Sequence, residues 1–243
     1  MNDNTIKLQA FLSQAGIASR RKCETLIAEG KVVVNDEVAH IGQRIDPAKD
    51  TVVCKGETIN SHEQKRYFLI DKPLGYVSTT NDEMGRREVT QLLPKEVKER
   101  LYPVGRLDID SEGLLLLTND GELAQKLTHP RYAVDKTYHV FTKRNPSFNA
   151  MMHLRKGVKL KEGYTNPATV ERLSTDDEGT WIELIINEGR NHQVKRMMER
   201  VGYPIEKLVR MTMGPLNIDM LEGETVIELS TEQVAELKNF LNR

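Results

Sequence analysis

The chain has 243 residues, enough for one large domain or for a small domain beside a medium one. With 38% hydrophobic and 29% charged residues it has the composition of a soluble globular protein, and no apolar run is long enough to predict a transmembrane helix. The N-terminus lacks the apolar run of a secretory signal, which predicts a cytoplasmic location.

The net charge of −1 conceals an uneven distribution of charged residues. Residues 6–31 and residues 190–210 are both rich in Lys and Arg, whereas the chain from Asn217 onward is acidic. Counterion release depends on local contacts with phosphates, so two basic stretches are compatible with nucleic-acid binding. For either stretch taken alone, a solvated charged face is the alternative.

The first sixty residues predict a compact module. Apolar residues at helical spacing indicate a first helix that ends at Gly16, and a second that starts after an N-cap at Ser19 and ends at Gly30. A β-rich run follows, with a turn at Asn35-Asp36, and then a further short strand. The polar segment Ser61 to Arg66 is a credible linker.

The longer remainder predicts alternating strands and helices. Together the patterns predict an α+β protein with a small N-terminal domain at 5–62 and a larger domain at 67–243, whose mixed, mainly antiparallel sheet is flanked by helices and loops. The expected strands are 68–70, 76–78, 114–118, 136–142 and 181–186, and the expected helices start near Glu122 and at Gln193.

The segment from Ala18 to Ile45 places basic residues at the start of a helix, where free backbone N–H groups also favour phosphate. Followed by G-K-V-V-V-N and a hairpin, it resembles the αL RNA-binding module named after a small-subunit ribosomal protein. The alternative is a generic two-helix cap. The residues expected to bind RNA here are Arg20, Arg21, Lys22 and Lys31.

Asp108 lies in a loop bracketed by Gly105 and Gly113, ahead of an apolar run. An isolated aspartate there is more often a turn or capping residue. The whole string GRLDIDSEGLLLLTNDG, however, resembles the signature of the RsuA/RluB-type pseudouridine synthases. The resemblance continues in order through DKPLGYVST (Asp71 to Thr79), DKTY (Asp135 to Tyr138) and NEGRNHQVKRM (Asn187 to Met197).

This resemblance implies an enzyme that isomerises a specific uridine of ribosomal RNA to pseudouridine. The bond from base nitrogen to ribose breaks, the uracil turns, and carbon 5 rejoins the ribose. No redox step occurs, so no metal or cofactor is expected. By resemblance Asp108 is the catalytic carboxylate, and both covalent attack and proton abstraction remain open.

A carboxylate in an apolar pocket needs a cationic or hydrogen-bonding partner to stay charged. Arg190, Lys195 and Arg196 are the candidates, with a slight preference for Arg196, because it begins the helical spacing that also carries Arg200. Contacts with RNA phosphates are the alternative, and Lys195 is assigned to RNA binding. His192 is expected to be structural or to contact RNA.

Two further residues are implied by the resemblance. Tyr138 offers a ring on which the extracted uracil can stack, although a strand tyrosine can equally belong to the core. Arg106 takes the place of the residue that fills the stack vacated by the flipped uridine, and its guanidinium can also bind phosphate.

Other functions are less consistent with the sequence. A non-catalytic RNA-binding or ribosome-assembly protein would be expected to have lost GRLD or Tyr138, and a hydrolase would bring metal-ligand clusters or a phosphate-binding glycine loop. Cys23 and Cys54 have no companions for a metal site or a disulfide framework. We expect a monomer that binds ribosomal RNA or an assembling subunit, with large-subunit rRNA favoured over small-subunit rRNA.

Overall fold

The computed structural model describes residues 5–59 and 64–242. Contacts divide the chain into one unit of residues 1–66 with 98–100, and another of residues 67–97 with 101–243. The expected linker begins at Ser61, and its part up to residue 63 lies outside the described residues. None of the helices within the described ranges has the length and apolar character needed to cross a membrane.

The first unit packs two short helices, α1 (Leu8–Gln14) and α2 (Arg20–Ala28), around a shared apolar core. The predicted N-cap forms, because Ser19 Oγ accepts a hydrogen bond from the Lys22 N–H at 3.3 Å. Asn35 and Asp36 both have positive φ, as a two-residue hairpin turn requires. Strands β2 (Val32–Val34), β3 (Glu37–Val38), β5 (Val52–Cys54) and β6 (Glu57–Thr58) form a sheet of order β3-β2-β5-β6, and β1 (Ile6–Lys7) pairs with β4 (Arg44–Ile45).

The second unit is built on a mixed sheet of nine strands within the described residues. Only β11 and β17 run parallel, and the other pairs of this sheet are antiparallel. The main order follows β15 (Thr169–Thr175), β16 (Thr180–Ile186), β12 (Lys136–Thr142), β17 (Lys207–Met213), β11 (Glu112–Thr118), β7 (Tyr67–Lys72) and β19 (Val226–Glu228), with β10 (Tyr102–Pro103) beside β11 and β18 (Leu216–Asn217) beside β17.

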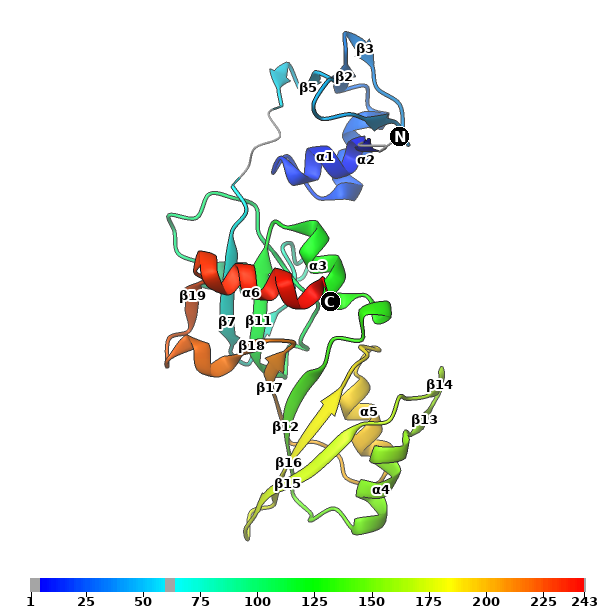
Figure 1. Ribbon diagram of the computed structural model, residues 1–243, viewed down its shortest axis with the longest axis vertical. Helices are drawn as coiled ribbons and strands as arrows, with labels where there is room; N and C mark the ends of the chain where they lie inside the picture. The colour runs from blue at the N-terminus through cyan, green and yellow to red at the C-terminus, as the bar shows by residue number, and fades with distance from the viewer. Residues whose placement is uncertain (1–4, 60–63, 243) are drawn as a thin grey trace. The chain divides into compact units, whose positions relative to one another are not determined.

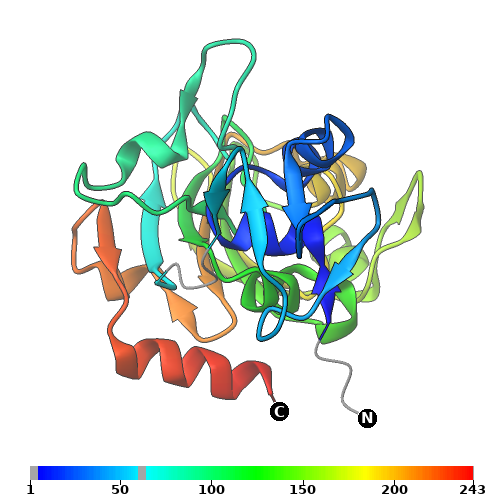
Figure 2. The ribbon, with the colours of Figure 1, turned by 90° about the horizontal axis from the view of Figure 1, so that it is seen from above.

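The continuous leucine run of β11 is explained by burial on both faces of the sheet. Leu114 and Leu116 pack in one core and Leu115 and Leu117 in another, because successive side chains of a strand point to opposite faces. The first core is closed by α3 (Gly121–Thr128) and α6 (Thr231–Leu241), and α6 crosses the strands as the red helix of Figures 1 and 2.

The second core is closed by α4 (Phe148–Lys156) and α5 (Gln193–Arg200), which lie beside β15 and β16 in Figure 1. Small elements complete the unit: β8 (Tyr76–Val77), β9 (Arg87–Glu88), β13 (Lys159–Leu160), β14 (Gly163–Tyr164) and the 3-10 turns at Val89–Leu92, Pro130–Tyr132 and Ile218–Leu221. The predicted α+β class with a mixed, mainly antiparallel sheet is confirmed.

Candidate active site

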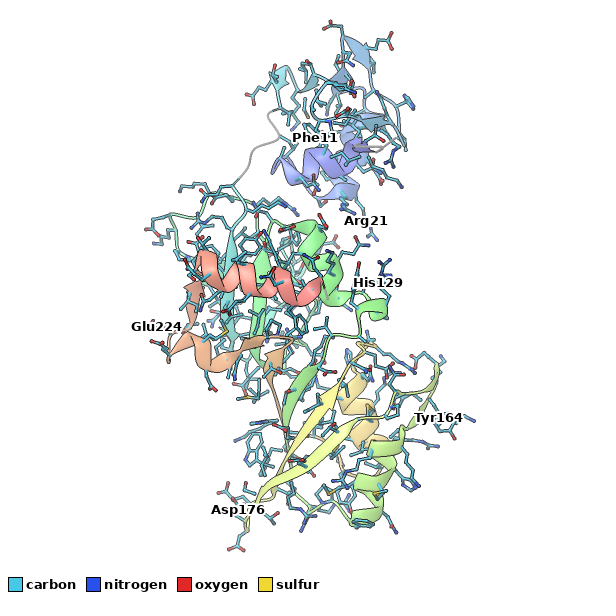
Figure 3. All side chains as sticks on the ribbon, viewed as in Figure 1. Phe11, Arg21, His129, Tyr164, Asp176 and Glu224 are labelled. Carbon is cyan, nitrogen blue, oxygen red and sulfur yellow. The ribbon has the colours of Figure 1, made fainter. Side chains whose placement is uncertain are left out.

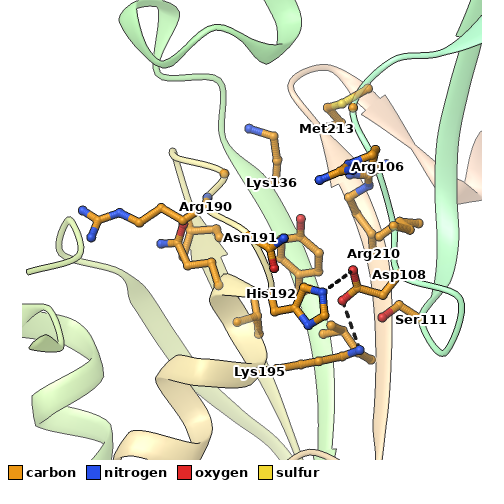
Figure 4. Close-up of a pocket in the computed structure, with 18 of the residues that line it drawn as sticks. Arg106, Asp108, Ser111, Lys136, Arg190, Asn191, His192, Lys195, Arg210 and Met213 are labelled. Carbon is orange, nitrogen blue, oxygen red and sulfur yellow. Dashed lines mark hydrogen bonds and ion pairs between the residues drawn. The ribbon is translucent and has the colours of Figure 1, made fainter. Parts of the chain in front are cut away.

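Asp108 lies in the loop that connects β10 to β11, on the wall of an open pocket of about 240 Å³ in the second unit (Figure 4). Its carboxylate is 3.1 Å from Lys195 Nζ and 3.6 Å from His192 Nε2, and 30% of the side chain is exposed. Among the described residues that line this pocket, Asp108 is the only carboxylate. The pocket therefore holds one anionic group, next to cations.

The loop is held in place by the DKPLGYVST segment. Buried Lys72 donates from Nζ to the carbonyl oxygen of Ser111 at 2.6 Å, and the Gly75 N–H donates to the carbonyl of Ile109 at 2.8 Å. Ser78 Oγ bonds to the backbone of Leu107, the residue before Asp108. None of the residues of this segment lines the pocket, and these side-chain and backbone groups all bond to the backbone of the Asp108 loop.

Lys195, not Arg196, is the ion-pair partner of Asp108. The preference for Arg196 is corrected, because its guanidinium pairs with Glu162 at 2.8 Å. Neighbouring residues of a helix point about 100° apart, so Lys195 and Arg196 reach different partners. His192, the N-cap residue before α5, reaches the same carboxylate as Lys195.

Lys195 also contacts Asp110, which is more exposed than Asp108. Burial acts to lower the pKa of Lys195, but its hydrogen bonds to Asp110 and Asp108 outweigh this effect, and the pKa is raised. The bond from Lys195 lowers the pKa of the Asp110 carboxyl. The lysine therefore stays protonated between two carboxylates.

Arg190 lines the pocket, yet its guanidinium is bound elsewhere and not to Asp108. Nε pairs with Glu188 at 3.1 Å, and the terminal nitrogens donate to the backbone of the β13–β14 hairpin at Gly163 and Tyr164. In Figure 4 the side chain extends away from Asp108. Its observed role is to hold that hairpin against the segment before α5.

Tyr138 lies on β12, is 8% exposed, and belongs both to the pocket wall and to the apolar core. Arg106 is exposed at the same pocket. Arg20, Arg21 and Lys22 are exposed at the start of α2 in the other unit, and Figure 3 shows Arg21 pointing away from its helix. Lys31 is also exposed, but it forms an ion pair with Glu29 at 2.6 Å.

Two further cations line the pocket that the sequence patterns did not single out as site residues, Lys136 and Arg210. Burial lowers the pKa of Lys136 to about 8, helped by the nearby charge of Arg210. Arg210 is 2% exposed and lies on the same buried face of β17 as Leu208. The sequence signal for Arg210 was a cation at a position where the alternation of the strand predicts an apolar side chain.

A β-bulge in β17 brings Arg210 and Met213 to the same pocket. Lys136 pairs with Met213, but Tyr138 pairs with Arg210, so one extra residue, Met211, sits opposite the step between them. Residues three apart on a regular strand face opposite sides. The bulge brings Arg210 and Met213 to the same side of the strand. The side chains that line the pocket therefore include both pairs, Lys136 with Met213 and Tyr138 with Arg210.

Comparisons with known proteins agree with this arrangement. A family model described as RNA pseudouridylate synthase matches residues 66–200, and an S4 domain model matches residues 6–52. A Bacillus subtilis (strain 168) protein named "Ribosomal large subunit pseudouridine synthase B" is 43% identical over 235 residues, covering 96% of this chain and 95% of that protein.

A Haemophilus influenzae protein of the same name is 39% identical over 222 residues, covering 89% of this chain and 62% of its own length. A crystal structure described as a pseudouridylate synthase matches with a TM-score of 0.68 at 28% identity, over 96% of this chain and 99% of that one. These matches confirm the RsuA/RluB-type resemblance. The chain belongs to the RNA pseudouridylate synthase family and is an enzyme of that class with an N-terminal S4 domain.

Proposed function

We propose that this enzyme isomerises a specific uridine of large-subunit ribosomal RNA, with Asp108 as the catalytic carboxylate. The observation that carries the proposal is the single carboxylate among the described pocket residues, held by Lys195 at 3.1 Å. The names of the Bacillus and Haemophilus relatives support the large subunit as the source of the substrate.

The reaction needs one ionised carboxylate. Lys195 Nζ lies 3.1 Å and His192 Nε2 lies 3.6 Å from the carboxylate of Asp108. As the bond from uracil N1 to ribose C1′ breaks, Asp108 either bonds to C1′ or removes the C2′ proton.

The pocket can accept one nucleotide but not a duplex, so a paired uridine must leave its stack. Tyr138 supplies a ring for the extracted base, a contact worth roughly 1–3 kcal/mol in other proteins. Arg106, exposed at the pocket, is placed to stack in the vacated position or to bind a phosphate.

Arg20, Arg21 and Lys22 are proposed to hold RNA through its phosphates, supported by the S4 match and by their exposure at the start of α2. We propose a monomer, because one chain supplies the whole pocket. The cytoplasm is the proposed location, where a ribosomal RNA substrate would be found.

The test compares Asp108→Asn with Asp110→Asn, two carboxylates that both contact Lys195. Carbodiimide mapping of ribosomal RNA from cells lacking the protein should lose one large-subunit stop. Native protein or D110N should restore it, and D108N should not. Restoration by D108N would refute the catalytic role, and a lost stop in the small subunit would refute the proposed substrate.

A further inference from the structure

Arg210 is a buried cation with spare hydrogen-bonding capacity in the pocket. Its Nε donates to the carbonyl oxygen of Leu114 at 2.7 Å, while one terminal nitrogen, NH2, is buried without a hydrogen-bond partner. None of the ion pairs found among the described residues includes Arg210. Burying an unsatisfied guanidinium nitrogen costs free energy, so this group is well suited to a ligand that enters the pocket.

The position of Arg210 restricts what that ligand can be. It pairs with Tyr138 across β12 and β17, and with Gly113 across β17 and β11, so it lies between the proposed stacking ring and the strand that ends the Asp108 loop. With 2% exposure, it is beyond the reach of a phosphate that stays on the RNA backbone. Exposed Arg106 suits a phosphate, and Arg210 suits the base.

We propose that Arg210 is a catalytic residue that donates a hydrogen bond to a uracil carbonyl oxygen and stabilises the negative charge of the detached base. This inference rests on the proposed function. When the bond between C1′ and N1 breaks, its electron pair stays on the uracil and is shared with O2 and O4. A fixed cationic donor at one of these oxygens binds the anion more strongly than the neutral base.

The remaining steps balance without another reactant. The anionic base turns, and C5 supplies the electron pair for the new bond to C1′. In the covalent route the bond between Asp108 and C1′ breaks in this step, and in the elimination route the proton that Asp108 took returns to C2′. The C5 proton then leaves, and N1 regains a proton. Lys136, which lines the same pocket and feels the charge of Arg210, adds positive potential but has a backbone partner, the carbonyl of Val134 at 2.9 Å. Of these two cations, Arg210 is therefore the one with a terminal nitrogen that has no hydrogen-bond partner.

The test uses single-turnover tritium release from an RNA fragment that spans the mapped uridine, made with [5-³H]uridine. Arg210→Gln keeps an N–H donor for Leu114 but removes the charge, and it should slow the reaction about 100-fold with RNA affinity little changed. Lys207→Gln removes an exposed cation from the same strand and should leave the rate unchanged.

A second measurement separates a contact with the base from a structural effect. Sulfur accepts hydrogen bonds weakly, so 2-thiouridine or 4-thiouridine at the target should slow the native enzyme about 10-fold at the contacted oxygen. The same substitution should have little further effect in R210Q. Should R210Q fail to fold, Arg210→Met, which also removes the donor, takes its place.

The outcomes distinguish the two proposals. No tritium release by native protein overturns the proposed function and this inference together. If native protein and R210Q release tritium at the same rate, only the proposed role of Arg210 is overturned. The same holds if the sulfur substitution slows native protein and the variant equally.

Discussion

The hydroxyl of Ser78 forms two hydrogen bonds with the backbone of Leu107, donating to its carbonyl oxygen at 2.8 Å and accepting from its N–H at 3.1 Å. Both bonds end one residue before Asp108. Ser78→Ala should therefore loosen the loop and lower the single-turnover rate about 10-fold, since a misplaced reacting group is costly even without lost contacts. The affinity of S78A for RNA should change little. Measuring the single-turnover rate and the RNA affinity separately checks both expectations.

Ser230→Ala is a matched control for Ser78→Ala. Ser230 caps α6 and is absent from the pocket lining, and its loss should lower the free energy of unfolding by about 1 kcal/mol, as for other N-caps. If S230A slows the reaction as much as S78A, global stability and not loop position explains the effect.

Lys195 and Arg196 are neighbours that pair with different carboxylates, Asp108 and Glu162. Replacing each in turn therefore tests which of the two ion pairs the reaction needs. Lys195→Met removes the cation beside Asp108 and should lower the single-turnover rate about 100-fold, the size found for one electrostatic contact at a reacting centre. Arg196→Met breaks the pair with Glu162 and should change the rate far less. A larger loss of rate in R196M than in K195M would instead identify Arg196 as the functional partner of Asp108.

Gly113 allows β11 and β17 to approach closely. Any Cβ at residue 113 would lie 2.4 Å from the carbonyl oxygen and 2.7 Å from the nitrogen of Arg210, and φ there is +101°. Gly113→Ala should lower the free energy of unfolding by about 2–5 kcal/mol, from backbone strain and overpacking together. Gly189→Ala, whose Cβ would have no neighbour within 4 Å, should cost less than about 1 kcal/mol in the same urea titration.

Lys136 should make stability depend on pH above neutrality. Burial lowers its folded pKa to about 8, whereas an unfolded lysine titrates near pH 10.4. Between these values the unfolded chain binds the extra proton, so stability rises with pH; below about pH 8 both states are protonated and the dependence vanishes. The unfolding free energy of native protein relative to Lys136→Met should therefore rise from pH 8 to 10. Parallel curves would contradict this.

The basic start of α2 should appear in the salt dependence of RNA binding. Replacing Arg20, Arg21 and Lys22 together by Ala should flatten the slope of log affinity against log salt by about 2–3, if each side chain contacts one phosphate. The rate at saturating RNA should stay unchanged, which serves as the internal control. An unchanged slope would argue against this surface as the RNA contact.

Local patterns predicted the fold class and many of its elements, but not α4, α6, β15, β17 or β19. The Ser19 cap, the Asn35-Asp36 turn and strand 136–142 each depend on chemistry within a few residues, and all three are observed. The ion-pair partner of Asp108 was harder to predict. Three basic residues lie within seven positions, and the predicted helix start at Gln193 did not show which side of α5 faces the Asp108 loop.

Arg210 could not be placed from local patterns, because its position depends on strand order and on a bulge. The parallel pairing of β17 with β11 joins residues almost a hundred positions apart, and strict alternation would not have put Arg210 and Met213 in one pocket. The doubly buried leucine run likewise marked β11 as a strand without indicating its neighbours.

The bulge at Met211 has a consequence for how this protein can vary. Deleting that single residue would restore regular pairing and leave Arg210 and Met213 two positions apart, on the same face of the strand. Both side chains would then still face the pocket, and the bend and added twist that the bulge gives to β17 would be lost. Loss of one residue is therefore tolerated at Met211, whose own side chain is not part of the pocket lining.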